Sequence, residues 1–243
     1  MQDIVLENVG AAKPLPQSAI LRQTMVDCQI RTFDVTDQRV LNRMLEVPRE
    51  QFLPADQAHL AYSDLALRLK PAAAGKEGRA LLAPLVLARL IQGAEVKPTD
   101  NVLDIAPGTG YSSALLAALS ARVHALESEQ QHFRALQSNF AALRLANAEA
   151  HLGPLAVGVP DEGPFDVIFV NGKVEANLEA LFAQLNDGGR LLALESVAGD
   201  LSGRAGRAVR YEKAGKAIGC RGLFDAASPV LRDFRRREQF SFN

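Results

Sequence analysis

Apolar and polar positions follow two different rhythms along the second half of this chain. Short apolar runs predict buried strands at 101–106, 122–126, 148–152, 165–170 and 190–194. Helical spacing predicts helices at 111–119, 129–145 and about 175–185, the last closed by Asp187-Gly188-Gly189. Within the second of these helices, one stripe should face the sheet: Phe133, Leu136, Phe140 and Leu143. Strands that alternate with helices are typical of a parallel sheet.

The first hundred residues are expected to be mostly helical. Helical periodicity runs from about Leu21 to Leu45, with a turn at Thr36-Asp37 and an end at Pro48, and a further helix covers about 82–91. Small and charged residues at 70–78 predict an exposed loop. We therefore expect a flexible leader at 1–20 and one domain at 21–243. That domain would comprise a helical part (21–97), a cofactor-binding core (98–203) and C-terminal strands (204–243).

The last residues carry two weaker signals. Phe240-Ser241-Phe242 alternates as an edge strand does. The run Arg235-Arg236-Arg237 is either a solvated surface segment or a contact for an anion or partner. The sequence by itself leaves these two alternatives open.

Composition narrows the class of protein. The 243 residues are 48% hydrophobic and 23% charged, as in an ordinary globular enzyme. The formal net charge of -1 argues against binding to nucleic acid, which requires a basic face. Cys28 and Cys220 lie far apart without a zinc-type grouping, so we expect no metal site and a reducing, cytoplasmic setting. We expect neither a secretion signal nor a membrane span.

The most informative stretch runs from Val102 to Tyr111, where a strand leads into a glycine turn and then a helix. Gly108 and Gly110 allow close approach of a ligand to the backbone. As a dinucleotide fingerprint the stretch is weak, because Ser113 stands where the third glycine belongs. A carboxylate at Asp104 suits a ligand that carries an ammonium or sulfonium group. S-adenosylmethionine carries both groups.

A second acid follows at the end of the next strand. Glu127 lies seventeen residues after Gly110, where a doubly wound fold presents a carboxylate to ribose hydroxyls. Each residue also has a plainer interpretation, with Asp104 as a turn cap, Glu127 as a surface acid and the glycines as a tight loop. The order of strand, acid, glycine turn, helix, strand and acid favours the cofactor site.

Three further motifs resemble the protein-L-isoaspartate O-methyltransferase family. They are Met25-Val26-Asp27-Cys28-Gln29-Ile30-Arg31, Val47-Pro48-Arg49-Glu50-Gln51-Phe52-Leu53-Pro54 and Ala61-Tyr62-Ser63-Asp64. The resemblance implies an α/β, Rossmann-like methyltransferase fold with a mostly parallel sheet and a helical N-terminal extension. It also implies methyl transfer from S-adenosylmethionine to an isoaspartyl carboxylate of a protein or peptide, leaving S-adenosylhomocysteine.

The same resemblance implies a set of site residues. Cofactor contacts are expected at Asp104, Ala106, Pro107, Gly108, Thr109, Gly110, Tyr111, Glu127, Ser128, Gly153, Pro154 and Asn171. Substrate contacts are expected at Arg79 and Leu82, in the segment that corresponds to the family's substrate loop, and at Asn171, at the carboxyl end of a predicted strand. A carboxylate acceptor with a pKa near 4 is already ionised at pH 7, so its methylation needs no general base.

Two departures from the family pattern concern binding. The substrate loop "GQTISQP" corresponds to Gly78–Pro84, where Ala80 and Leu82 replace the threonine and serine hydroxyls. Arg79 either replaces those donors with a charge-assisted contact or is a surface arginine. The family's "GDG" becomes Gly153-Pro154-Leu155, without the aspartate that accepts from the adenine amino group.

These departures leave three functions open. The chain is a repair methyltransferase, a methyltransferase with another acceptor, or a cofactor-binding protein without catalysis. The loss of the loop hydroxyls predicts weak or absent methylation of isoaspartyl peptides, because a desolvated carboxylate would regain too few hydrogen bonds.

Overall fold

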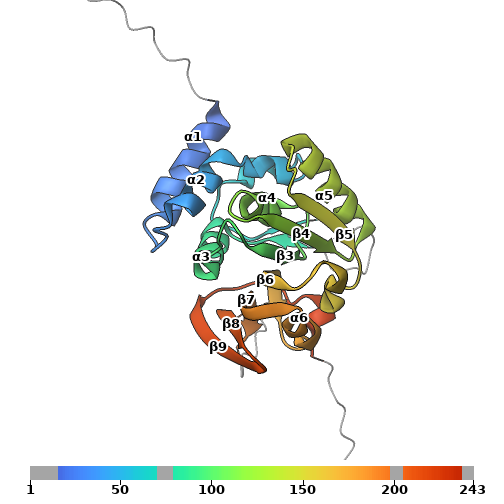
Figure 1. Ribbon diagram of the computed structural model, residues 1–243. Coiled ribbons are helices and arrows are strands. Elements are labelled where there is room, and N and C mark those ends of the chain that lie inside the picture. The colour runs from blue at the N-terminus through green and yellow to red at the C-terminus, as the bar shows by residue number, and fades with distance from the viewer. Residues whose placement is uncertain (1–15, 70–78, 198–204, 237–243) are drawn as a thin grey trace, which may run out of the picture.

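The apolar runs of the second half build a seven-stranded sheet (Figure 1). The computed structural model describes residues 16–69, 79–197 and 205–236. In spatial order the strands are β5 (Ala148–Leu152), β4 (Arg122–Glu127), β3 (Asn101–Ile105), β6 (Phe165–Val174), β7 (Leu185–Ser196), β8 (Gly206–Ala214) and β9 (Ala217–Asp225). Pairing is parallel from β5 through β7 and antiparallel between β7, β8 and β9. The predicted α/β class with a mostly parallel sheet is confirmed.

One face of the sheet is covered by the long helices. Alternate strand residues such as Val102, Val123 and Val167 are fully buried there against α3 (Pro84–Ala94) and α4 (Tyr111–Ala117). The same cluster takes in α2 (Gln38–Glu46) and the π-helical η1 (Met25–Ile30), which continues α1 (Gln17–Thr24). Further along this face, α5 (Gln130–Leu143) packs on β4 through Leu136 and Phe140.

The opposite face is covered by shorter elements. Leu103, Ile105 and Ile168 pack against α6 (Glu179–Ala183) and the 3-10 turns η4 (Leu155–Val157) and η6 (Arg232–Phe234). A third 3-10 turn, η5 (Pro160–Glu162), follows η4 in the chain. The N-terminal part also holds η2 (Arg49–Phe52), η3 (Ala58–Leu60) and a small antiparallel pair of β1 (Leu67–Arg68) and β2 (Ala80–Leu81).

The chain crosses over at β3, which determines where a ligand can bind. From β3 the chain builds outward through β4 to β5, and it then returns with β6 on the other side of β3. Open parallel sheets bind ligands outside the carboxyl ends of the strands at such a point. The glycine turn predicted as the cofactor loop begins there.

Several predicted boundaries differ from the structure. The helix expected at about 175–185 is only Glu179–Ala183, because the N–H groups of Glu175 and Ala176 donate to the Phe234 carbonyl and Asn177 has a φ of 66°. Asp187-Gly188-Gly189 lies inside β7, not after a helix. In the predicted stripe, Leu136 and Phe140 are buried whereas Phe133 and Leu143 are half-buried. The first helix starts at Gln17, four residues before the predicted start.

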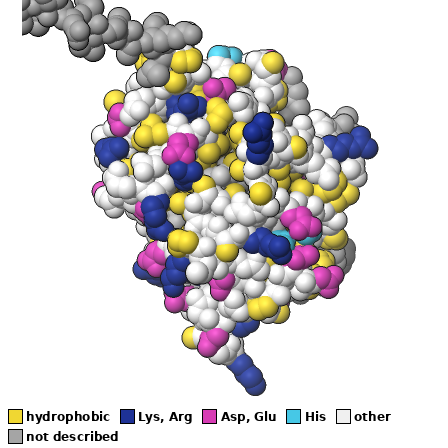
Figure 2. Space-filling model, turned by 45° about the horizontal axis from the view of Figure 1, so that its top comes forward, with side chains coloured by type: hydrophobic (Ala, Val, Ile, Leu, Met, Phe, Trp, Pro, Cys, Tyr) yellow, Lys and Arg dark blue, Asp and Glu magenta, His cyan; other side chains and the backbone are white. Residues whose placement is uncertain are grey.

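Some predictions concern residues outside the described part of the chain. They are the leader before residue 16, the loop at 70–78 and the edge strand at Phe240-Ser241-Phe242. Among the residues that are described, no helix combines the length and apolarity needed to cross a bilayer. On the face drawn in Figure 2, Lys and Arg side chains are scattered among acidic ones and do not gather in one patch.

Candidate cofactor and acceptor site

The glycine turn after β3 has the backbone that its residues predict. Gly108 and Gly110 have φ values of 65° and 97°, in the left-handed region that favours glycine. A Cβ at Gly108 would lie 2.7 Å from Leu69 Cδ1, and one at Gly110 would lie 2.7 Å from Leu136 Cδ2. Both glycines are therefore required by conformation and by packing. Ala106 also lies in the left-handed region, with φ 57°.

Asp104 lies beneath this turn and is fully buried. Its carboxylate accepts hydrogen bonds from Ser112 Oγ (2.8 Å) and Ser113 Oγ (2.6 Å) at the start of α4. It also accepts one from Asn171 Nδ2 on β6 (2.6 Å). Burial raises the pKa of Asp104 to about 6, although these three donors oppose the rise. The described contacts of Asp104 join β3, β6 and α4, and Ser113 serves as a donor where a dinucleotide fold has glycine.

Glu127 ends β4 directly beside the turn and is also fully buried. Gly108 N–H donates to Oε1 at 2.7 Å, and Ser128 N–H donates to Oε2 at 3.2 Å. Arg79 Nε donates to Oε2 at 3.0 Å, and its guanidinium also donates to Ser128 Oγ at 2.7 Å. Burial raises the pKa of Glu127 to about 7 against the influence of Arg79. The surface-acid interpretation of Glu127 and the surface-arginine interpretation of Arg79 are both wrong.

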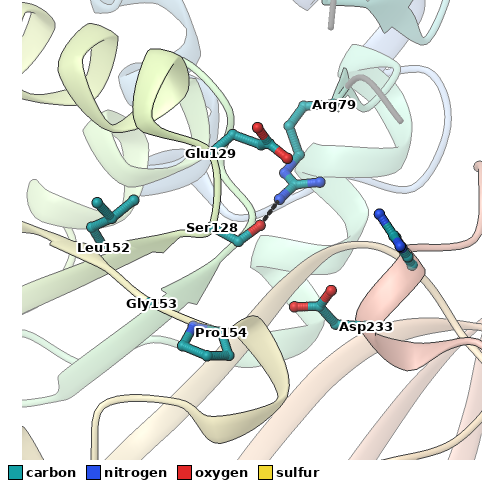
Figure 3. Close-up of a pocket in the computed structure, with 8 residues that line it drawn as sticks. Arg79, Ser128, Glu129, Leu152, Gly153, Pro154 and Asp233 are labelled. Carbon is teal, nitrogen blue, oxygen red and sulfur yellow. Dashed lines mark hydrogen bonds between the residues drawn. The ribbon is translucent and has the colours of Figure 1, made fainter. Parts of the chain in front are cut away.

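A cavity of about 430 Å³ opens beside this ion pair (Figure 3). Four of the predicted site residues line this cavity: Arg79, Ser128, Gly153 and Pro154. Leu152 and Glu129 complete the walls on β5 and after β4, while Arg232 and Asp233 come from η6. The volume lies within the range of small-ligand sites.

Asp233 is one of four lining residues that the sequence analysis missed, together with Glu129, Leu152 and Arg232. Figure 3 shows its side chain across the cavity from Arg79, near Pro154. Asp233 Oδ2 accepts from Leu155 N–H at 2.9 Å, which ties η6 to the segment after β5. Because these residues lie 78 positions apart, no local pattern links them. An acidic residue in a short C-terminal turn carries no motif that would have found it.

The other predicted residues lie around the site in different ways. Asn171 donates to Asp104 and to the carbonyl of Ile105 (3.1 Å), at an irregular point in the β6–β7 pairing. Thr109 Oγ1 donates to the Phe52 carbonyl (2.6 Å). Leu82 is buried in the core, where its carbonyl accepts from the Arg49 guanidinium (2.8 Å).

Tyr111 is completely buried at the start of α4, so its side chain supports the turn from below. The Arg49 guanidinium carbon lies 4.8 Å from the centre of its ring, and the Phe52 ring packs edge-on at 5.4 Å. The motif Val47–Pro54 therefore packs, through Arg49 and Phe52, against Tyr111, the first residue of α4.

Comparisons with known proteins place most of this chain in one family. The family model described as protein-L-isoaspartate (D-aspartate) O-methyltransferase matches residues 21–201. A protein-L-isoaspartate O-methyltransferase of Koribacter versatilis is 35% identical over 184 residues, covering 76% of this chain and 80% of that protein. The one from Roseiflexus castenholzii is 35% identical over 171 residues, covering 70% and 75%.

Solved structures show the same fold. A protein-L-isoaspartate O-methyltransferase superposes with a TM-score of 0.74 at 24% identity, covering 88% of this chain and 65% of the other. A Plasmodium falciparum structure, described as a putative enzyme of this kind in complex with S-adenosyl-L-homocysteine, has a TM-score of 0.69 at 20% identity. It covers 90% of this chain and 100% of the other.

Proposed function

Because this chain belongs to the protein-L-isoaspartate (D-aspartate) O-methyltransferase family, we propose that it methylates a carboxylate of a protein or peptide at the site built around Glu127. S-adenosylmethionine is the cofactor of this family, and when bound it supplies an electrophilic methyl group. The observation that carries the proposal is the buried Glu127 carboxylate, held at the end of β4 by the Gly108 N–H and by Arg79, which lines a cavity of about 430 Å³.

The residues present fit the cofactor at its ribose and adenine. Glu127 offers two carboxylate oxygens to the two ribose hydroxyls, as a doubly wound fold does at the end of its second strand. Gly153 and Pro154 form the wall beyond it. The family's adenine-binding aspartate is replaced by Pro154, and Asp233 supplies a carboxylate on the opposite side of the same cavity. We assign Asp233 to the adenine amino group.

Asp104 holds neighbouring elements in place and does not itself contact the cofactor. Its described hydrogen bonds go to Ser112, Ser113 and Asn171. It therefore fastens the first turn of α4 and the strand β6 to β3, on either side of the glycine turn. The cationic end of the cofactor is attracted by this carboxylate without touching it.

Arg79 is the residue proposed for the acceptor side. In the structure its guanidinium pairs with Glu127, the same carboxylate that the ribose hydroxyls require. Cofactor binding therefore has to release Arg79 from that carboxylate. A released guanidinium beside the methyl donor is suited to hold an acceptor carboxylate through charge-assisted hydrogen bonds. It takes over the task of the threonine and serine that Ala80 and Leu82 replace.

A second candidate is a methyltransferase whose acceptor is a carboxylate other than isoaspartate. It is favoured by Ala80 and Leu82, because a core leucine offers no hydrogen bond to the isoaspartyl backbone. Arg79 recognises any carboxylate in reach and does not by itself select isoaspartate.

Transfer of a tritiated methyl group distinguishes these functions. The assay compares an isoaspartyl peptide, its aspartyl counterpart and a protein extract as acceptors. The protein-L-isoaspartate O-methyltransferase of Koribacter versatilis serves as the positive control. We expect slow transfer to the isoaspartyl peptide, at least about thirtyfold below the relative, since two lost hydrogen bonds cost roughly 1–3 kcal/mol each. Turnover near 1 per second, an ordinary enzymatic rate, would contradict the altered acceptor site. No transfer to any acceptor, despite cofactor binding, would identify a non-catalytic binder.

We also propose a reducing compartment, the cytoplasm, for this protein. Cys28 and Cys220 are both exposed and free, which supports a setting that keeps thiols reduced.

A further inference from the structure

Two histidines and a glutamate come together on adjacent strands, and none of the three lines the cavity described above. His124 lies on β4, and Glu149 and His151 lie on β5. The parallel register pairs His124 with Glu149 and Leu126 with His151, so alternation puts all three side chains on the same face. His124 Nδ1 lies 3.1 Å from His151 Nε2, and the ligand atoms of the three residues lie within 4.8 Å of one another.

We propose that His124, Glu149 and His151 form a binding site for a divalent transition-metal ion, with Zn²⁺ as the expected occupant. Two imidazole nitrogens with a carboxylate oxygen are a donor set that zinc prefers. Nitrogens bonded at 2.0–2.1 Å to a tetrahedral ion are about 3.4 Å apart, so the two rings need to move by only a few tenths of an ångström. Glu149 is exposed, and its side chain can rotate to bring the carboxylate to the ion.

The surroundings of the three residues suit a cation. Glu162, on η5, has Oε2 at 3.9 Å from His124 Nδ1 and can serve as a fourth ligand. Among the described residues, the acids Glu149 and Glu162 act on His124, and the cation Arg122 opposes them. Burial and His151 also lower the pKa of His124, which keeps its ring neutral and able to bind metal.

The hydrogen bond between the two rings does not prevent metal binding. In the metal-free state one ring donates a hydrogen bond to the other across the 3.1 Å contact. When Nδ1 of His124 ligates a metal, its proton moves to Nε2, and no net charge is added to the ring. His151 is half-buried, so an ion can reach the pair from solvent.

The position of the site gives it a structural consequence. β5 is the edge strand of the sheet and pairs only with β4 among the described strands. An ion held by both strands would fasten this edge just before Leu152 and Gly153, which line the cavity beside Glu127. Metal binding should therefore stabilise the wall of the cofactor cavity, while the site itself does not depend on the acceptor chemistry.

The test is titration of the full, chelator-treated chain with Zn²⁺ against a chromophoric competitor, and with Co²⁺ followed by its visible absorption. His151→Gln and Glu149→Gln remove ligands that are not buried, so both variants are expected to fold. His59→Gln is the matched control on an exposed histidine outside the cluster. A Cys28→Ser/Cys220→Ser double variant controls for the exposed thiols.

We expect one equivalent of Zn²⁺ and the intense absorption of tetrahedral Co²⁺ in the wild type and in both controls. Each cluster variant should weaken binding by at least about tenfold. The proposal is overturned by an absence of saturable binding, by unchanged affinity in His151→Gln, or by loss of binding in a control.

Discussion

Ala106 holds a backbone conformation that an alanine tolerates poorly. Its φ of 57° lies in the left-handed region, where a Cβ costs roughly 1–2 kcal/mol. Ala106→Gly should therefore leave the free energy of unfolding unchanged or raise it by up to about 1 kcal/mol, as measured by urea denaturation. Ala135→Gly, within α5, is the matched control and should lower it by about 1 kcal/mol. Equal losses in both variants would mean that Ala106 is unstrained.

Arg79 is predicted to oppose cofactor binding and to favour acceptor binding. Arg79→Gln removes the guanidinium that competes for Glu127, so calorimetry should show S-adenosylhomocysteine bound up to about tenfold more tightly. The same variant should lower kcat/KM for the methyl acceptor by at least about tenfold, because one charge-assisted contact is lost. Arg68→Gln, at an exposed position of β1, should change neither quantity. Parallel loss of both in Arg79→Gln would instead indicate a purely structural arginine.

Among the elements, the junction of β3 with α4 contains a titrating group. Asp104 has its pKa raised from 3.8 to about 6, so the folded state holds its proton more strongly than the unfolded state does. This contribution to stability is present at pH below about 4 and is lost as the pH rises to about 6. Between those values the wild type should lose on the order of 2–3 kcal/mol relative to Asp104→Asn. The check is urea unfolding of both proteins across this range, and parallel profiles would contradict the prediction.

In the turn η6, the Asp233 carboxylate is predicted to accept a hydrogen bond from the adenine amino group. The wild type should bind S-adenosylhomocysteine about tenfold more tightly than S-inosylhomocysteine, in which an oxygen replaces that amino group. Asp233→Asn keeps an oxygen for the Leu155 N–H but should lose this preference. Asp161→Asn, an exposed acid on η5, serves as the control. An unchanged preference in Asp233→Asn would remove this residue from the adenine contact.

At the scale of the whole molecule, ligand binding should raise the melting temperature. S-adenosylhomocysteine at a hundred times its Kd contributes about 2.7 kcal/mol, or roughly 5–10 °C for a chain of this size. Glu127→Ala should weaken binding by about 1.5–3 kcal/mol and remove most of this shift at the same concentration. Glu179→Ala, on the surface of α6, should retain it. A full shift in Glu127→Ala would show that the ribose is held elsewhere.

The sequence by itself determined the fold class and the position of the glycine turn after β3. Burial and backbone conformation leave local signals, such as apolar runs in β3 and β4 and glycines where φ is positive at residues 108 and 110. The same kind of signal failed for the start of α6, because Glu175 and Ala176 donate to the distant Phe234 carbonyl and not within a helix, a contact that leaves no local pattern.

Only the tertiary structure decided which side chains meet. Arg79 and Glu127 lie 48 residues apart, and Asp104 and Asn171 lie 67 apart. The path of the chain across the sheet brings each pair together, and local periodicity contains no information on that path. Glu127 was predicted from its place at a strand end, whereas its partner Arg79 and the opposite wall at Asp233 depend on contacts between distant segments.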